Sequence, residues 1–211
     1  MKATTKNLVL TAVLAALMIL FGMTPIFYIP MPWGVQVTLM CLPIIIGTLV
    51  LGLRTGFFLG LLFGLTSFAQ LFINPSPILA PLFFNPQNFW EPVLYLLIVF
   101  IPRMAIGPVT WLVSRAFGSK AGKISVMVAS AAGSLTNTAG FLGMLYLLFG
   151  TRVGEMIASL GLPYNSAGAF VLFVGVSNGL PEAAVAVAVC LPIVVALRKT
   201  YKQKTIGEKT E

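Results

Sequence analysis

Histidine is absent from this 211-residue chain, and charged residues make up only 9% of it. Soluble domains carry about 25% charged residues, so this chain has too few to cover a water-facing surface. Only five residues are acidic, and the lack of histidine removes the commonest general base and metal ligand. These absences exclude an ordinary cytoplasmic enzyme.

Cysteine is also scarce, and no motif for nucleotide hydrolysis is present. Cys41 and Cys190 lie in apolar runs without a CxxC partner, so we expect two buried free thiols. The string from Gly118 to Lys123 lacks the spacing of a phosphate-binding loop and is followed by isoleucine. We therefore expect no catalytic site, no metal site and no cofactor, and the chain cannot power ATP-driven transport by itself.

Apolar residues dominate instead, at 58% of the sequence, and the mean hydropathy is +1.00. A membrane-spanning helix needs about 20 largely apolar residues. Six runs fit, at residues 8–23, 37–53, 55–73, 92–117, 124–149 and 167–197. The sixth is long enough to tilt or to contain a break near Asn178 to Pro181. The fold class is therefore all-α: one six-helix membrane domain over residues 1–211, including a short basic tail at 198–211.

The basic residues predict the orientation of these spans. With a cytoplasmic N-terminus, the loops on that side and the tail hold nearly all of the lysines and arginines, whereas the other side holds only Arg152. The positive-inside rule then places both termini in the cytoplasm. The net charge of +8 therefore reflects topology and contact with membrane lipid rather than nucleic-acid binding.

Two outer loops, at residues 24–36 and 74–91, are rich in proline, aromatic and amide residues. Proline fixes φ and limits disorder, so these loops should have defined shapes. They could form a lid over a small-molecule site, or they could be interfacial loops with an ordinary aromatic belt.

Small residues recur at helical spacing on two of the spans. Gly56, Gly60 and Gly64 form one stripe, and Ala12 and Ala16 make a similar step on the first span. Such faces let helices approach closely in a membrane. Each stripe either packs inside this chain or docks on another membrane subunit, and the first span is the better candidate for docking.

Arg103 and Glu182 lie inside predicted spans, where an ionisable residue is costly and therefore suggests a function. At 1.5 Å per residue from Pro92, Arg103 lies roughly 16 Å deep. The two side chains could pair with each other. Alternatively, Arg103 faces a cavity and offers its planar fork to an anionic ligand. Asn137, Asn178 and Gln70 add amides at comparable depth, which indicates a polar cup in the outer half of the bundle.

Several strings resemble the S components of energy-coupling factor (ECF) transporters. Ala12-Val-Leu-Ala-Ala16 resembles the docking step of that family's first helix, and Leu42 to Gly64 resembles its second and third helices. The later segments are similar at three strings: Phe100-Ile-Pro-Arg103, Gly133-Ser-Leu-Thr-Asn137-Thr138 and Asn178-Gly-Leu-Pro-Glu182. The resemblance covers nearly the whole chain.

The resemblance implies a prokaryotic plasma-membrane subunit that binds one vitamin tightly. Such a subunit docks on the EcfT scaffold through Ala12 and Ala16, and two cytoplasmic ATPases drive its toppling and vitamin release. Within the family the chain most resembles the pantothenate type. Arg103 would then hold the carboxylate, Asn137, Asn178 and Glu182 would take the hydroxyl and amide groups, and Trp33, Trp90 and Tyr95 would close the top.

Other readings remain open at this point. Folate is the main alternative vitamin, because it also offers carboxylates and a pterin that Glu182 and aromatic residues could hold. A stand-alone secondary transporter is the alternative of a different class, although the sequence lacks a convincing internal repeat. A membrane enzyme acting on lipid would need a nucleophile or an acidic pair that the sequence does not supply.

Overall fold

The protein is an elongated helical bundle in a computed structural model that describes residues 5–24, 28–30, 36–117 and 122–207. Within these residues it contains seven helices and one small hairpin. The helices are α1 (Thr5–Met23), α2 (Cys41–Leu51), α3 (Leu53–Ile73), α4 (Ala80–Phe84), α5 (Glu91–Ala116), α6 (Gly122–Ser159) and α7 (Ala167–Gly207). Strands β1 (Tyr28–Pro30) and β2 (Gln36–Thr38) pair antiparallel, with Tyr28 opposite Thr38.

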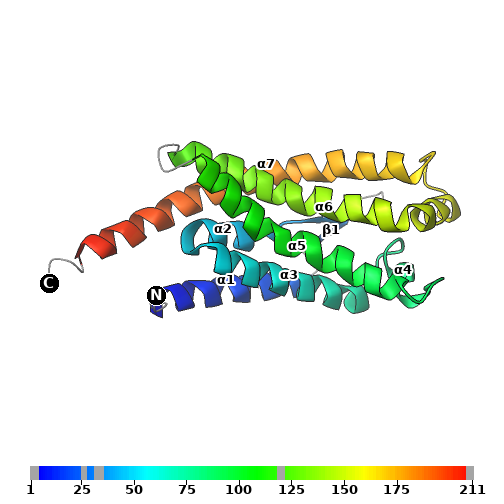
Figure 1. Ribbon diagram of the computed structural model, residues 1–211, viewed down its shortest axis with the longest axis horizontal. Coiled ribbons are helices and arrows are strands. Elements are labelled where there is room, and N and C mark those ends of the chain that lie inside the picture. The colour runs from blue at the N-terminus through cyan, green and yellow to red at the C-terminus, as the bar shows by residue number, and fades with distance from the viewer. Residues whose placement is uncertain (1–4, 25–27, 31–35, 118–121, 208–211) are drawn as a thin grey trace.

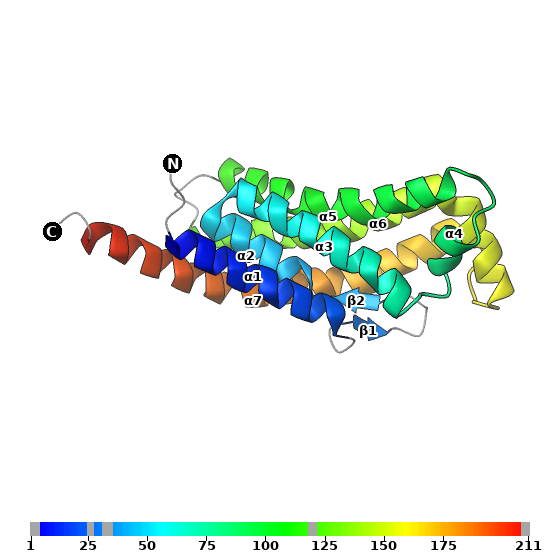
Figure 2. The same cartoon turned by 90° about the horizontal axis from the view of Figure 1, so that it is seen from below.

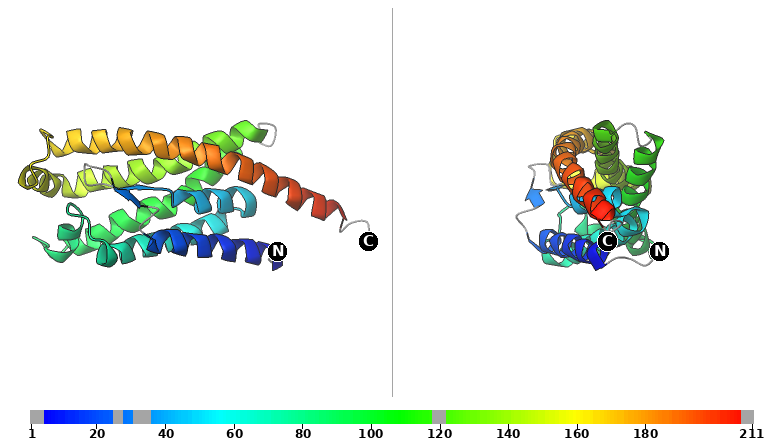
Figure 3. Two further views of the ribbon diagram at one scale, coloured as in Figure 1. Left: turned by 180° about the vertical axis from the view of Figure 1, so that it is seen from behind. Right: turned by 90° about the vertical axis from the view of Figure 1, so that its left-hand side faces the viewer.

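The long helices run along one axis, as Figures 1 and 2 show. Helices α1, α3 and α6 run away from the end where the chain termini lie, and α5 and α7 run back towards it. Both termini lie at the same end of the bundle, and α4 lies at the opposite end (Figure 3). The ends of α1, α3, α5, α6 and α7 near the termini carry Lys6, Arg54, Arg115, Lys123 and Arg198, respectively. We call this the basic end and the α4 end the outer end. The assignment of the basic end to the cytoplasm stays a prediction.

Five helices are long and apolar enough to cross a membrane: α1, α3, α5, α6 and α7. The predicted second span, 37–53, differs from the structure. Its first two residues belong to strand β2, and its helix, α2, has only 11 residues. At 1.5 Å per residue, α2 is about 16 Å long, roughly half of a bilayer's hydrocarbon core. The bundle is thus five long helices around one short one.

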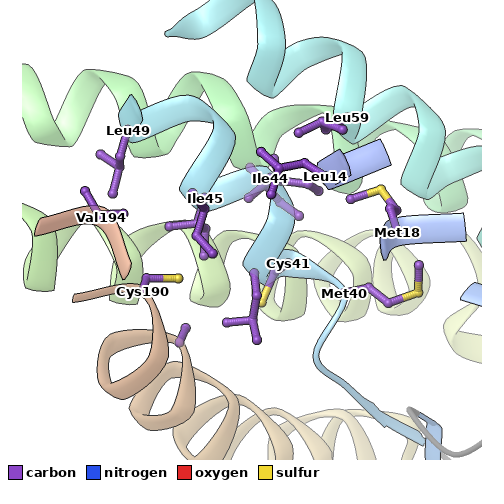
Figure 4. Packing of buried hydrophobic residues seen from close by; sticks show 14 of the residues in the cluster. Leu14, Met18, Met40, Cys41, Ile44, Ile45, Leu49, Leu59, Cys190 and Val194 are labelled. Atoms are coloured by element: carbon purple, nitrogen blue, oxygen red, sulfur yellow. The ribbon is translucent and has the colours of Figure 1, made fainter. Parts of the chain in front are cut away.

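Helix α2 lies in the half of the bundle nearer the basic end (Figure 1), and Figure 4 shows side chains of other helices packed around it. It contacts α1, α3, α5, α6 and α7, and its residues from Cys41 to Leu49 are all buried. This enclosure explains why its sequence is apolar on every side. The two cysteines, Cys41 and Cys190, are free and buried, as the sequence predicts.

Two helices continue through segments where the sequence suggested interruptions. Helix α6 runs to Ser159, beyond the end of the predicted span at 124–149, and its one non-helical residue is Phe149 (φ −129°, ψ 16°). Helix α7 runs without interruption through Pro181 and Pro192. The break considered near Asn178 to Pro181 is therefore absent, and α7 extends to Gly207 through most of the predicted tail.

The glycine stripe of α3 packs against α5 within this chain. A Cβ added at Gly56 would lie 3.1 Å from the Cα of Gly107, and one added at Gly60 would lie 2.6 Å from the carbonyl oxygen of Arg103. A Cβ at Gly64 would likewise meet the ring of Phe100 at 2.6 Å. Of the two open interpretations, internal packing is the one that the contacts support for this stripe.

We expect Gly60→Ala to destabilise the protein, because the new methyl group would meet backbone atoms of α5 that cannot rotate away. Overpacking of this kind costs about 1–3 kcal/mol. Thermal unfolding in detergent measures the effect as a lowered midpoint. Gly143→Ala is the matched control, because nothing lies within 4 Å of its added Cβ and alanine favours a helix. A Gly60→Ala midpoint equal to that of Gly143→Ala would contradict the close-packing argument.

Candidate ligand-binding site

A cavity of about 140 Å³ lies among α3, α5, α6 and α7 in the outer half of the bundle. Six of the eight residues predicted to bind substrate line it: Gln70, Tyr95, Arg103, Asn137, Asn178 and Glu182. The structure thus brings together side chains that are up to 112 positions apart in the chain, from Gln70 to Glu182. Their convergence in one hollow is the geometry expected of a small-molecule site.

Arg103 supplies a cation in the cavity wall. It follows Pro102 in α5, and its Nη1 donates a hydrogen bond to the carbonyl oxygen of Ile98 at 3.0 Å. The centre of its guanidinium, Cζ, lies 4.4 Å from the ring centroid of Phe141 and 5.5 Å from that of Phe63. The guanidinium is therefore partly removed from solvent and held at a defined place in the wall.

Polar groups from α6 and α7 complete another part of the wall. Glu182 is 5% exposed, and its Oε2 accepts a hydrogen bond of 2.8 Å from the Thr138 hydroxyl. Asn178 is 3% exposed. Asn137 is also buried, and its Oδ1 has no hydrogen-bond partner among the described residues. An unsatisfied buried acceptor costs about 1–3 kcal/mol, so Asn137 is suited to receive a donor from a ligand.

Gln70 and Tyr95 connect the cavity to the elements around it. The Gln70 side-chain amide donates to the backbone carbonyl of Gly22, near the end of α1. Tyr95 is 4% exposed and packs against Phe83 of α4, with ring centroids 5.6 Å apart. The wall therefore contacts both the first helix and the outer loop.

Of the two predicted tryptophans, only Trp90 lies among the described residues. Trp90 is 66% exposed, does not line the cavity, and packs edge-on against Phe89 instead. Such a pair at the outer end fits the aromatic belt of a membrane interface. Trp33 lies outside the described residues.

Sequence reasoning missed several wall residues. Thr138 belongs to a string singled out for its resemblance, but no role was given to it. Phe63 and Phe141 also line the cavity. They are uncharged residues in apolar helices, so residue type alone does not distinguish them from residues that face lipid or the core. The available signal was helical periodicity, since Phe141 lies one turn after Asn137 and so shares its face.

The outer loop between α3 and α5 is fastened over this end of the bundle. Asn74, Ser76 and Leu79 line the cavity, and the neighbouring Ile78 and Leu82 are buried in the core. The loop therefore has a packed, defined shape, as its prolines predict, and it forms part of the cavity wall.

A charged cluster ties this loop to α6. Arg152 Nη2 donates to the backbone carbonyl of Asn85 at 2.9 Å, and its Nε lies 3.7 Å from Glu91 Oε1. Glu91 Oε2 accepts a 2.8 Å hydrogen bond from the backbone N–H of Gln87. The Glu91 side chain is only 7% exposed, so this carboxylate depends on these partners.

We expect Arg152→Gln to loosen the loop, because it leaves the buried Glu91 carboxylate without its cation. The substitution also removes the charge-assisted hydrogen bond to the Asn85 carbonyl. Loss of such a bond costs about 1.5–3 kcal/mol, and 1.4 kcal/mol is a factor of ten. Amides of residues 85–91 should then exchange hydrogen at least about tenfold faster, as mass spectrometry would measure.

The matched control for this prediction is Glu155→Gln. Its ion pair with the same arginine spans 3.8 Å, but the Glu155 side chain is 56% exposed, so the pair should contribute little. Exchange at residues 85–91 should stay as in the wild type. If Glu155→Gln accelerates exchange as much as Arg152→Gln does, the cluster does not act through Glu91.

Two comparisons with known proteins indicate what this chain is similar to. Residues 6–194 match the model of a family described as "ECF transporter, substrate-specific component". The pantothenic acid transporter PanT of Lactococcus lactis subsp. cremoris (strain MG1363) is 32% identical over 207 residues, covering 94% of this chain and 96% of the relative. With five helices of membrane-crossing length, the chain is a multi-pass membrane protein. It belongs to the family of substrate-specific components of ECF transporters, as the resemblance of its strings predicts.

Proposed function

We propose that this protein binds pantothenate and delivers it across the plasma membrane of a prokaryote as the S component of an ECF importer. The observation that carries the proposal is the placement of Arg103 in one cavity with Asn137, Asn178 and Glu182. Pantothenate has a carboxylate at one end, an amide in the middle and hydroxyl groups at the other end. The cavity offers a cation together with amide and carboxylate acceptors, which complement those groups.

Each group of the ligand has a counterpart in the wall. Arg103 holds the carboxylate through charge-assisted hydrogen bonds. The Asn137 acceptor receives a hydroxyl or amide proton, and Asn178 and Glu182 take the remaining polar groups. The 32% identity to a pantothenic acid transporter supports the choice of this vitamin over folate.

Transport needs partners that supply energy. The family membership supports assembly with an EcfT scaffold and two cytoplasmic ATPases. The face that we assign to the scaffold is the exposed surface of α1 around Ala12 and Ala16, both of which are exposed in this structure. Neighbouring apolar residues of α1 are exposed too, including Val9 at 57% and Val13 at 49%. Small residues on such a face allow a second helix to approach closely.

Isothermal titration calorimetry of the detergent-purified chain tests the binding function. The ligands are pantothenate, folate, riboflavin, thiamine, biotin and cobalamin, together with panthenol, in which a neutral hydroxyl replaces the pantothenate carboxylate. We expect saturable binding of pantothenate at one site and binding of panthenol weaker by about 100-fold, as loss of a buried charge pair costs about 2–5 kcal/mol. Saturable binding of a different vitamin, or of none, would refute the assignment to pantothenate.

A further inference from the structure

Uncharged neighbours help to position Arg103. The first of these is Pro102, which lies inside α5. Proline has no backbone N–H, so the carbonyl four residues earlier loses its helical donor. That carbonyl belongs to Ile98, and Arg103 Nη1 donates to it at 3.0 Å. The proline thus creates an acceptor that draws the arginine side chain back along its own helix toward the outer end.

Two aromatic rings from other helices also lie close to the guanidinium. Phe141 of α6 lies 4.4 Å from Arg103 Cζ, and Phe63 of α3 lies 5.5 Å from it. Both distances are within the range of a cation–π contact, which strengthens when the cation is desolvated. All three side chains line the same cavity. The closer ring therefore contacts the cation at the surface where the ligand would bind.

We propose that Phe141 is a positioning residue that sets the place of the Arg103 guanidinium and thereby determines selectivity for an anionic ligand over a neutral one. This inference rests on the proposed function, since it concerns how the same cavity recognises a carboxylate. The Ile98 carbonyl fixes one edge of the guanidinium, and Phe141 fixes its depth in the wall. A carboxylate is recognised by two parallel N–H bonds only when the guanidinium has a fixed orientation.

A simple packing role for Phe141 makes a different prediction. Phe141 also packs against the buried residues of the outer half of the bundle. Its loss could therefore reshape the wall and weaken the binding of any ligand. Reshaping of the wall would weaken the binding of charged and neutral ligands alike. Displacement of the guanidinium would weaken the binding only of the ligand whose carboxylate it holds. The ratio of the panthenol to the pantothenate dissociation constant separates the two roles.

The experiment compares Phe141→Leu with Phe141→Tyr, which keeps the ring, and with Leu142→Ala. Leu142 lines the same cavity and belongs to the same buried cluster, so it serves as the matched packing control. Calorimetry should give about tenfold weaker pantothenate binding for Phe141→Leu, with panthenol within about threefold of wild type. Phe141→Tyr should restore the wild-type ratio, and Leu142→Ala should weaken both ligands equally.

A ligand-independent measurement keeps the inference testable by itself. In arginine-labelled protein studied by nitrogen-15 NMR, the Arg103 side-chain resonance, assigned by its loss in Arg103→Lys, should be displaced by the Phe141 ring current. Phe141→Leu should move it towards the position of exposed arginines, and Phe141→Tyr should not.

The outcomes separate this inference from the proposed function. If the wild type binds neither pantothenate nor panthenol, the proposed function fails, and the arginine resonance alone decides whether Phe141 positions Arg103. An unmoved resonance in Phe141→Leu overturns the inference whatever the ligand. Equal weakening of pantothenate and panthenol in Phe141→Leu also overturns it, because Phe141 then acts as packing only.

Discussion

Replacing Arg103 with alanine should weaken pantothenate binding by at least about 100-fold and leave panthenol binding within about threefold of wild type. Removing one partner of a buried, hydrogen-bonded charge pair costs about 2–5 kcal/mol, and each 1.4 kcal/mol is tenfold. The arginine lies in the cavity wall between two aromatic rings, so little water is available to replace it beside the ligand. Calorimetric titration of the two ligands measures both effects.

Arg103→Lys is the matched control for charge without shape. Lysine keeps the cation but offers no planar fork, so it cannot reproduce the bidentate geometry. We expect its pantothenate affinity to lie between those of wild type and Arg103→Ala. A thermal unfolding midpoint near that of wild type would show that both variants remain folded. Unchanged pantothenate affinity in Arg103→Ala would exclude the arginine as the carboxylate ligand.

The long helices could be predicted from hydropathy, because each is an apolar run of sufficient length. The predicted spans at 8–23 and 92–117 correspond to α1 (Thr5–Met23) and α5 (Glu91–Ala116) within a few residues. The length of α2 could not be predicted in this way. Residues 37–53 are apolar almost throughout, and hydropathy does not distinguish a spanning helix from a short helix enclosed by others.

The polar half of the candidate site could be predicted from the cost of burying charge and amides in a membrane. That argument selected Arg103, Glu182, Asn137 and Asn178, and all four line one cavity. The same argument gives no weight to apolar residues, so it could not select the ring of Phe141 against the guanidinium.

Loop residues were the least predictable part of the site. The family resemblance implies that Trp90 closes the site, yet Trp90 is 66% exposed and pairs with Phe89. The loop that carries Trp90 is fastened to α6 through the contact of Arg152 with Asn85. That contact joins residues 67 positions apart and leaves no local pattern in the sequence.

Replacing Ala12 and Ala16 together with leucine should abolish ATP-dependent pantothenate uptake while leaving pantothenate affinity within about twofold of wild type. Both alanines are exposed on α1, which makes no contribution to the cavity wall among the described residues. Two leucine side chains would keep a docking helix from approaching closely. The hydrophobic effect does not drive helices together within lipid, so it cannot replace the lost close packing. Uptake is measured in proteoliposomes that contain EcfT and both ATPases, and affinity is measured by calorimetry on the isolated chain.

The chain carries its own matched control for this experiment. Ala184 and Ala188 are also exposed and four residues apart, but they lie on α7. If docking uses α1, leucine at both α7 positions should leave uptake near the wild-type rate, although the change in surface volume is the same. The opposite pattern, with uptake lost in the α7 pair and kept in the α1 pair, would place the scaffold on α7. Loss of uptake in both pairs would show that bulk anywhere on the lipid-facing surface blocks transport, and the argument for a specific α1 face would fail.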